Sequence, residues 1–219
     1  MLQVQSFVFN PFQENTFVLY DETKECIIID PGCSDEMEKM QLKTFIEKHK
    51  LKVKLLLNTH CHIDHILGNR FVKETYKVNL LVHRIEEPVL KAAEVYAPSY
   101  GFHLYQHQPP DAFLEEGDHI MFGNQTLTVL FVPGHSPGHV AFYNEKNGIL
   151  ISGDVLFYNS IGRTDLPGGN HELLLNSIHT KLFTLPSPVR VYPGHGPETT
   201  IGFEKKTNPF CAVNNIDIE

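Results

Sequence analysis

Four apolar stretches of this chain each lead directly into a short segment that carries a histidine or an aspartate. The stretches span residues 53–57, 127–132, 148–151 and 189–192, and their composition is typical of buried strands. Glycine or proline follows closely after the last three and turns the chain sharply. If the four strands end at one edge of the fold, the polar side chains after them meet in one cleft. The pattern therefore predicts a strand-rich core with its chemistry gathered at one edge.

These segments supply seven side chains of the kinds that bind metal ions. Taken singly, a His-x-His pair, a Pro-Gly-His turn or a Gly-Asp turn is ordinary loop sequence. Four such groups crowded into residues 60–65 serve no packing purpose, however, and three further groups follow other strands. We therefore predict a metal site. The candidate ligands are His60, His62, Asp64, His65, His135, Asp154 and His195.

The number of candidate ligands indicates the kind of site. A structural zinc ion is enclosed by four protein ligands, whereas a catalytic zinc ion keeps one position open for water. Seven groups exceed the needs of one ion and suit two ions that share a carboxylate. Imidazole and carboxylate ligands favour zinc, although they also admit iron or manganese. We therefore expect two Zn²⁺ ions.

The remaining pattern predicts strands and helices that are mixed along the chain. Residues 97–117 are polar, aromatic and proline-containing, which suits a long surface loop. Two runs of strands, each mixed with helices, suggest two sheets with helices packed outside them. The expected strands are at about 1–9, 16–20, 26–29, 53–57, 80–82, 119–122, 127–132, 139–143, 148–151 and 189–192. The expected helices are at about 35–48, 65–76, 87–96 and 171–182.

Size and composition favour one globular domain over residues 1–219. The chain is 42% hydrophobic and 20% charged, and a domain of this length buries roughly 70% of its unfolded surface. Its net charge of −8 argues against a nucleic-acid groove or an anionic membrane surface as partner. The absence of a signal-like start, of a long apolar run and of paired cysteine spacing suggests a cytoplasmic protein with reduced thiols.

Several segments of the sequence resemble the metallo-β-lactamase superfamily, whose THxHxDH hallmark appears here as Thr59 to His65. Within it, the chain is most similar to the glyoxalase II (hydroxyacylglutathione hydrolase) branch, particularly its short bacterial and archaeal relatives. The resemblance implies an α+β fold, an αββα sandwich of two mixed β-sheets with helices on both outer faces. It runs over nearly the whole chain, through NPFQENTFVL, IIIDPG, THCHIDH, FVPGHSPGHV, SGDVLF, SIGRTDLPGG and VYPGHGPETTIGFEKKTNPF.

The resemblance also implies a role for each candidate ligand. His60, His62 and His135 would hold one metal ion, whereas Asp64, His65 and His195 would hold the other. Asp154 would bridge the two ions, and Asp64 would also orient the attacking hydroxide, so both aspartates are expected to be catalytic. His139 is expected to be structural, and Cys61 to fill space rather than act as a nucleophile. We expect Thr59 and Asp165 to hold imidazoles in place.

The implied reaction is hydrolysis of a small-molecule acyl thioester such as S-lactoylglutathione, by attack of a metal-bound hydroxide on the carbonyl carbon. Full-length relatives carry a C-terminal helical domain and a Lys-Phe-Tyr stretch that grip the glutathione tail. This chain has Arg163-Thr164-Asp165 instead and retains only Lys205 and Lys206 near its end. Arg163 is a candidate for binding a substrate carboxylate. We therefore expect weak binding of the glutathione part of the substrate.

Other reactions occur on the same scaffold, so the resemblance does not fix the chemistry. A mononuclear iron persulfide dioxygenase shares the HxHxDH and GRTD segments, and the latter is present at 162–165. An N-acyl-homoserine lactonase would fit the same cleft, and a non-enzymatic metal-binding role is a further alternative. A secreted β-lactamase would be expected to carry a signal peptide and to lack the bridging aspartate. The sequence specifies neither the acyl group, nor the metal, nor the oligomeric state.

Overall fold

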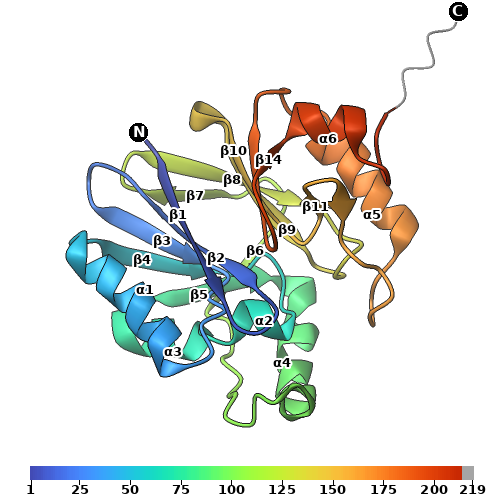
Figure 1. Ribbon diagram of the computed structural model, residues 1–219. Coiled ribbons are helices and arrows are strands. Elements are labelled where there is room, and N and C mark those ends of the chain that lie inside the picture. The colour runs from blue at the N-terminus through green and yellow to red at the C-terminus, as the bar shows by residue number, and fades with distance from the viewer. Residues whose placement is uncertain (214–219) are drawn as a thin grey trace, which may run out of the picture.

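The computed structural model describes residues 1–213 as four layers in the order helices, sheet, sheet, helices (Figure 1). This arrangement confirms the expected αββα sandwich of two mixed sheets. Helices α1 to α4 pack on the outer face of the first sheet, and helices α5 and α6 cover the second sheet. The helices are α1 (Glu36–Lys48), α2 (Ile63–Ile66), α3 (Asn69–Tyr76), α4 (Glu87–Tyr96), α5 (His171–Ser177) and α6 (Ile201–Thr207).

The first sheet has the strand order β1-β2-β3-β4-β5-β6. Its first three strands pair antiparallel, and the pairs from β3 to β6 are parallel. The strands are β1 (Gln3–Phe9), β2 (Glu14–Tyr20), β3 (Glu25–Ile29), β4 (Lys52–Leu57), β5 (Asn79–His83) and β6 (Ala112–Leu114).

The second sheet has the order β14-β13-β10-β9-β8-β7. It is antiparallel except for the parallel pair β10 and β13. Since β8 and β10 both run antiparallel to β9, strands β8, β10 and β13 all point the same way. The strands are β7 (His119–Phe122), β8 (Gln125–Phe131), β9 (Val140–Asn144), β10 (Ile149–Gly153), β13 (Arg190–Pro193) and β14 (Thr199–Thr200); β11 (Leu156–Phe157) and β12 (Ser160–Ile161) form a separate hairpin.

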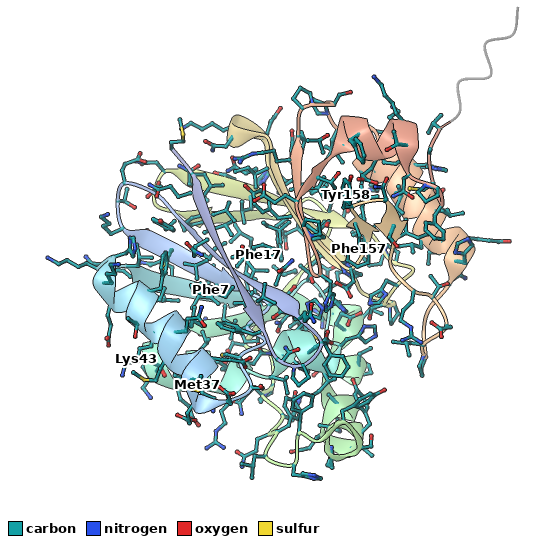
Figure 2. All side chains as sticks on the ribbon, in the orientation of Figure 1. Phe7, Phe17, Met37, Lys43, Phe157 and Tyr158 are labelled. Atoms are coloured by element: carbon teal, nitrogen blue, oxygen red, sulfur yellow. The ribbon has the colours of Figure 1, made fainter. Side chains whose placement is uncertain are left out.

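The alternation of side chains along a strand divides the core into layers. In β2, Phe17 belongs to the apolar layer between the two sheets, whereas Val18 packs toward the helices. In β10, Ile149 and Ile151 likewise face the first sheet, while Leu150 packs under α5 and α6. Figure 2 labels Phe17 in the layer between the sheets. Strands buried on both faces explain why these segments read as continuous apolar runs.

The structure corrects three details of the expected elements. The helix expected over 65–76 is two helices, because Gly68 interrupts it and donates its N–H to the carbonyl of Pro31 at 2.6 Å. The expected loop 97–117 contains a 3₁₀ turn, Ala97–Tyr100, and ends in strand β6. The helix expected over 171–182 changes after Ser177 into a wider π-helical turn, in which Phe183 donates its N–H to Ile178 at 2.8 Å. Among the described residues, no helix is long and apolar enough to cross a membrane.

Candidate metal centre

The candidate ligands come together because of the strand directions. Strands β8, β10 and β13 end at the same edge of the second sheet, and β4 of the first sheet ends opposite them. Two backbone hydrogen bonds join the sheets at this edge. Val140 donates to the carbonyl of Thr59 at 2.8 Å, and Asn15 donates to the carbonyl of Gly194 at 2.7 Å.

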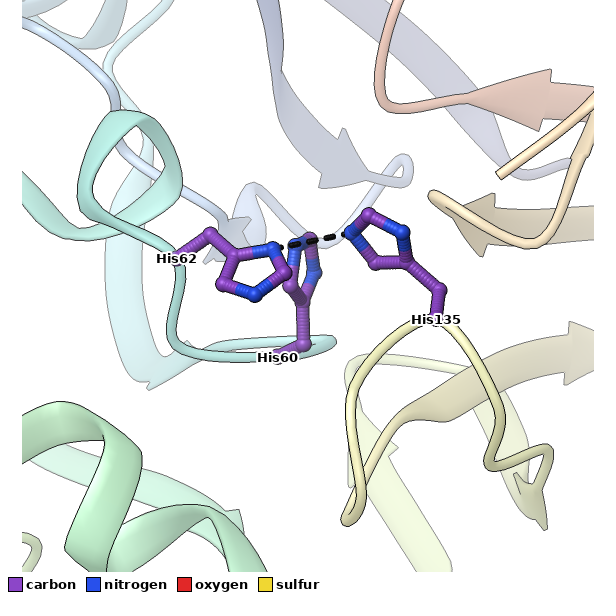
Figure 3. Close-up of side chains that lie close together, drawn as sticks. All are labelled: His60, His62 and His135. Carbon is purple, nitrogen blue, oxygen red and sulfur yellow. Dashed lines mark hydrogen bonds between the residues drawn. The ribbon is translucent and has the colours of Figure 1, made fainter. Parts of the chain in front are cut away.

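His60, His62 and His135 form the first group of candidate ligands (Figure 3). One ligand nitrogen from each lies within 4.8 Å of the others. Nδ1 of His62 lies 2.8 Å from Nε2 of His135, and the ring of His60 stands edge-on to both. Two loops from different sheets therefore contribute to one three-nitrogen group.

Asp64, His65 and His195 form the second group, again with one ligand atom each within 4.8 Å of the others. Nε2 of His195 lies 3.2 Å from Oδ2 of Asp64, and Nε2 of His65 lies 3.7 Å from the same oxygen. The group combines two imidazoles and one carboxylate.

The carboxylate of Asp154 lies between the two groups. Its Oδ2 is 3.6 Å from Nε2 of His135 in the first group and 3.4 Å from Nε2 of His195 in the second. Its Oδ1 is 3.5 Å from Nε2 of His65. One side chain therefore reaches both groups, which is the position that a bridging ligand requires.

Hydrogen bonds assign the tautomers of four of the imidazoles. In each, Nδ1 faces an oxygen that can accept its proton, so Nε2 is the nitrogen left to bind a metal ion. The hydroxyl of Thr59 donates to Asp30 at 2.6 Å, so its oxygen is left to accept from His60. The Nδ1 contacts are His60 to Thr59 Oγ1 at 3.1 Å, His65 to Asp30 Oδ2 at 3.2 Å, His135 to the Arg163 carbonyl at 2.8 Å and His195 to the Phe12 carbonyl at 3.1 Å.

Within residues 1–213, three buried atoms of the candidate ligands have no hydrogen-bond partner: Nε2 of His60, Nε2 of His65 and Oδ1 of Asp154. An orphaned buried acceptor is costly in a folded protein unless something else satisfies it. Because these atoms belong to metal-binding side chains and face the same space, the residues present fit divalent metal ions. Neutral imidazole and carboxylate are the ligand types that zinc, iron and manganese accept.

The imidazoles of the two groups differ in the direction in which their pKa values are shifted. Burial lowers the pKa values of His60 and His135, and it lowers that of His62 to about 3, so these imidazoles are neutral. Burial alone would also lower the pKa values of His65 and His195. Instead, the carboxylates of Asp154 and Asp64 raise that of His65 well above its usual range and that of His195 to about 9. In return, the imidazoles beside Asp154 hold its pKa well below its usual range, despite burial.

The centre is buried at the first group and opens toward solvent at the second. In the first group His60 and His135 are buried, whereas in the second group 28% of the His195 side chain is exposed. Phe12, whose carbonyl holds His195, packs its ring 5.9 Å from that of Tyr100 and 6.1 Å from that of Phe102. The segment after α4 therefore contributes an aromatic rim beside the exposed side of the centre.

The residues expected to support the ligands behave differently from one another. Thr59 contacts His60 as expected, but Asp165 makes no hydrogen bond with an imidazole of the described residues. Its two carboxylate oxygens instead accept from Nε and Nη2 of Arg163, at 2.7 Å each. His139 belongs to neither ligand group, and its Nε2 accepts the backbone N–H of Asp154 at 3.0 Å. Burial raises the pKa of the Cys61 thiol, which keeps the thiol protonated.

Sequence reasoning missed the residues that hold the ligand loops from outside. Asp30 forms a buried cluster with His60 and His65 and accepts the backbone N–H of Thr59 at 2.7 Å. Asp30 directly follows the apolar strand β3, and this position could have indicated a residue at the same edge as the ligands. Asn15 donates its side-chain amide to two carbonyls that flank His195, at 2.9 Å each. No local pattern distinguishes Asn15 from an ordinary strand residue.

Comparison with known proteins supports the family resemblance. A family model described as the metallo-β-lactamase superfamily matches residues 9–195. The probable metallo-hydrolase YqgX of Bacillus subtilis is 40% identical over 201 residues, which cover 91% of this chain and 93% of YqgX. Hydroxyacylglutathione hydrolase GloC of Haemophilus influenzae is 36% identical over 201 residues, with the same shares covered.

Two solved structures are similar over almost the whole chain. BLEG-1, described as a B3 metallo-β-lactamase, superposes with a TM-score of 0.88 at 39% identity, covering 96% of this chain and all of BLEG-1 (100%). TTHA1623, solved in a di-iron-bound form, superposes with a TM-score of 0.84 at 38% identity, covering 94% and 100%. With its sandwich fold and its paired histidine and aspartate clusters, the chain belongs to the metallo-β-lactamase superfamily and is a relative of metallo-hydrolases.

Proposed function

We propose that this chain is a dinuclear metal-dependent hydrolase that cleaves a small acyl thioester. The observation that carries the proposal is the position of Asp154, whose carboxylate lies between two three-ligand groups. Zinc is the metal we propose, because neutral imidazoles predominate. Iron and manganese share these ligands, and the di-iron-bound TTHA1623 supports iron as the alternative.

The residues that would hold the ions follow from the geometry. His60, His62 and His135 would hold one ion, and Asp64, His65 and His195 the other, with Asp154 shared between them. Bound divalent ions would supply two kinds of chemistry: they lower the pKa of a coordinated water to near neutrality, and they polarise a carbonyl oxygen.

The chain's own side chains orient and select the reactants. Asp64 lies at the solvent-facing side beside His195, where its carboxylate can accept a hydrogen bond from an attacking water. Burial of the first group excludes bulk water from one side of the reacting carbonyl. The thiolate that leaves would take its proton from solvent, which reaches the centre past His195.

A thioester is the proposed substrate because of two observations. GloC, named as a hydroxyacylglutathione hydrolase, is similar along nearly its whole length. The rim of Phe12, Tyr100 and Phe102 offers aromatic surface to a small acyl or thiol group. Arg163 is the proposed contact for a substrate carboxylate, and Asp165, which already pairs with its guanidinium, would compete for it. We propose a cytoplasmic location, which suits four buried cysteines that are all free thiols.

A β-lactamase activity is the second candidate, because BLEG-1 is described as a B3 metallo-β-lactamase. A β-lactam amide presents the same kind of carbonyl as a thioester, so the geometry of the centre does not separate the two substrates. The two differ in the group that leaves, and a direct comparison of rates distinguishes them.

The test is a turnover panel on the zinc-loaded protein, with the persulfide assayed also on protein loaded with ferrous iron, because zinc has no redox chemistry. It compares kcat/KM for S-lactoylglutathione, the lactoyl thioester of N-acetylcysteamine, an N-acyl-homoserine lactone, a β-lactam and glutathione persulfide. We expect both thioesters to be cleaved, with a glutathione preference below about 10³-fold, or roughly 4 kcal/mol. A larger preference would reveal an intact glutathione clamp. Faster lactone or β-lactam hydrolysis, or oxygen uptake with the persulfide, would contradict the thioester proposal.

A further inference from the structure

Glu86 is a buried carboxylate that lies outside both ligand groups but contacts the loops that carry one of them. It ends the 3₁₀ turn Arg84–Glu86, immediately before α4, and is fully buried. Its Oε2 accepts the backbone N–H of Cys61 at 2.8 Å. Cys61 lies between His60 and His62, so this bond fixes the loop that follows β4.

The other oxygen of Glu86 holds the loop that follows β8. Oε1 accepts the hydroxyl of Ser136 at 2.5 Å and the backbone N–H of Gly138 at 2.7 Å. Ser136 directly follows His135, the third nitrogen ligand of the first group. One carboxylate therefore joins the two loops, from different sheets, on which the first group depends.

The fit between this loop and Glu86 is close. A Cβ atom on Gly138 would lie 2.7 Å from the backbone nitrogen of Glu86 and 2.9 Å from its Cγ. Contacts this short require something to move, so glycine is what allows the loop to reach the carboxylate. The loop is thus packed directly onto Glu86.

The chemistry of the contact depends on a carboxylate. An ionised Glu86 only accepts hydrogen bonds, and its partners at Cys61, Ser136 and Gly138 are all donors. A glutamine side chain has the same shape but carries one NH₂ group. In either orientation that NH₂ would face a buried backbone N–H, which would be left unpaired.

We infer that Glu86 is a positioning residue that sets the spacing of His60 and His62 relative to His135, and thereby the metal affinity of that group. This inference rests on the proposed metal centre. It predicts an effect concentrated in the three-histidine group, because Glu86 bonds to both loops that carry that group. In the second group, Asp64 and His65 follow Cys61 in α2, and among residues 1–213 no hydrogen bond joins Glu86 to the loop that carries His195.

The experiment measures zinc affinity by competition with a chromophoric chelator in two backgrounds. His195→Ala leaves the three-histidine group intact, and His62→Ala leaves the other group intact. Adding Glu86→Gln to His195→Ala should weaken zinc binding by about 10- to 100-fold, the usual effect of removing a group that orients metal ligands. Adding Glu86→Gln to His62→Ala should change the affinity by less than about threefold.

The chain offers a matched control in Glu204. It is also fully buried, and it accepts hydrogen bonds from a hydroxyl, a backbone N–H and a side-chain amide, those of Thr199, Asn159 and Asn208. Glu204→Gln should lower the melting temperature without changing zinc affinity in the His195→Ala background. A purely structural role for Glu86 would make the two substitutions behave alike.

If Glu86→Gln does not fold, Ser136→Ala tests the same inference, because it removes one of the three bonds. We then expect a smaller loss of affinity, still concentrated in the three-histidine group. Equal weakening of both groups, or equal effects of Glu86→Gln and Glu204→Gln, would overturn the inference. Measurements on the unmodified protein separate this result from the proposed function. Two bound ions without thioester turnover would refute the function alone, whereas no zinc binding would refute both.

Discussion

At the scale of single residues, the centre depends on which nitrogen of each imidazole carries its proton. Backbone carbonyls hold Nδ1 of His135 and His195, so Nε2 of each ring faces the centre before any ion arrives. Such fixed tautomers reduce the reorganisation that binding requires and make the ligands stronger donors. The orientation of the ligands is therefore built into the main chain around them.

The position of Asp154 gives a prediction at this scale. Because its carboxylate reaches both ligand groups, Asp154→Ala should lose metal from both together and lower kcat by more than about 100-fold. Metal content by plasma emission and thioester turnover measure the two effects.

His139→Ala is the control for Asp154→Ala. His139 accepts the backbone N–H of Asp154 and stacks on the ring of His60 at 4.7 Å between centroids, but it belongs to neither ligand group. The variant should therefore retain both ions but lose about 1–3 kcal/mol of unfolding free energy, because a buried N–H is left unpaired. Equal metal loss in the two variants would contradict the structural role assigned to His139 in the PGHSPGH segment.

The seven candidate ligands and the support from Thr59 were predicted from the sequence, and the structure brings these residues together, whereas the contacts of Glu86 could not be predicted. His60, His62 and His65 are recognisable because the chemistry is crowded into a few adjacent positions. Glu86 meets Cys61 across 25 positions and Gly138 across 52, and only the folded chain brings them together. Asp165 was expected to support an imidazole, but Arg163 offers it a closer, oppositely charged partner.

At the scale of elements, the turn that follows β13 requires a small residue where candidate ligands crowd together. A Cβ on Gly194 would collide with Oδ1 of Asp154 and lie 2.7 Å from Cε1 of His65. Gly196, two positions later, has φ of +75° but nothing within 4 Å of an added Cβ. The first glycine is thus needed for space and the second for backbone conformation.

This difference predicts opposite outcomes for two neighbouring substitutions. Gly194→Ala should displace Asp154 and His65 and weaken metal binding by at least about tenfold. Gly196→Ala should retain metal affinity and cost about 1 kcal/mol of stability, because alanine disfavours a positive φ. Chelator competition and urea unfolding measure these effects. Loss of metal from Gly196→Ala alone would contradict the assignment.

Helices and strands were predicted correctly where the sequence pattern is long, and they were missed where tertiary contacts determine the local structure. Helix α1 begins at an N-cap, Asp35, that accepts the N–H of Glu38 at 2.9 Å, and its bounds were expected closely. Strands β11, β12 and β14 have two residues each, too few for a periodic signal. Helix α6 was missed, although Thr200 caps it.

At the scale of the whole molecule, the fold does not depend on the centre for its core. Three apolar layers hold the sandwich together: one between the sheets, and one under the helices on each side. When no ion is bound, the raised pKa values of His65 and His195 keep these imidazoles charged beside Asp64 and Asp154. Opposite charges therefore balance within the buried centre.

Metal removal should consequently leave the chain folded but less stable. After chelation we expect an unchanged far-ultraviolet circular dichroism spectrum and a melting temperature lower by roughly 10 °C. An ion present at a thousandfold excess over its Kd stabilises the folded chain by about 4 kcal/mol. Each kcal/mol shifts the melting temperature by about 2–4 °C in a chain of this size. Loss of the folded spectrum on chelation would show that the metal ions are structural.

The most direct test of the central claim is a zinc titration of the metal-free protein, followed by its rate of thioester hydrolysis. Because Asp154 joins two ligand groups in one centre, the rate should rise to a plateau at about two equivalents of zinc per chain. A plateau at one equivalent, or no hydrolysis at any zinc concentration, would contradict a dinuclear thioester hydrolase.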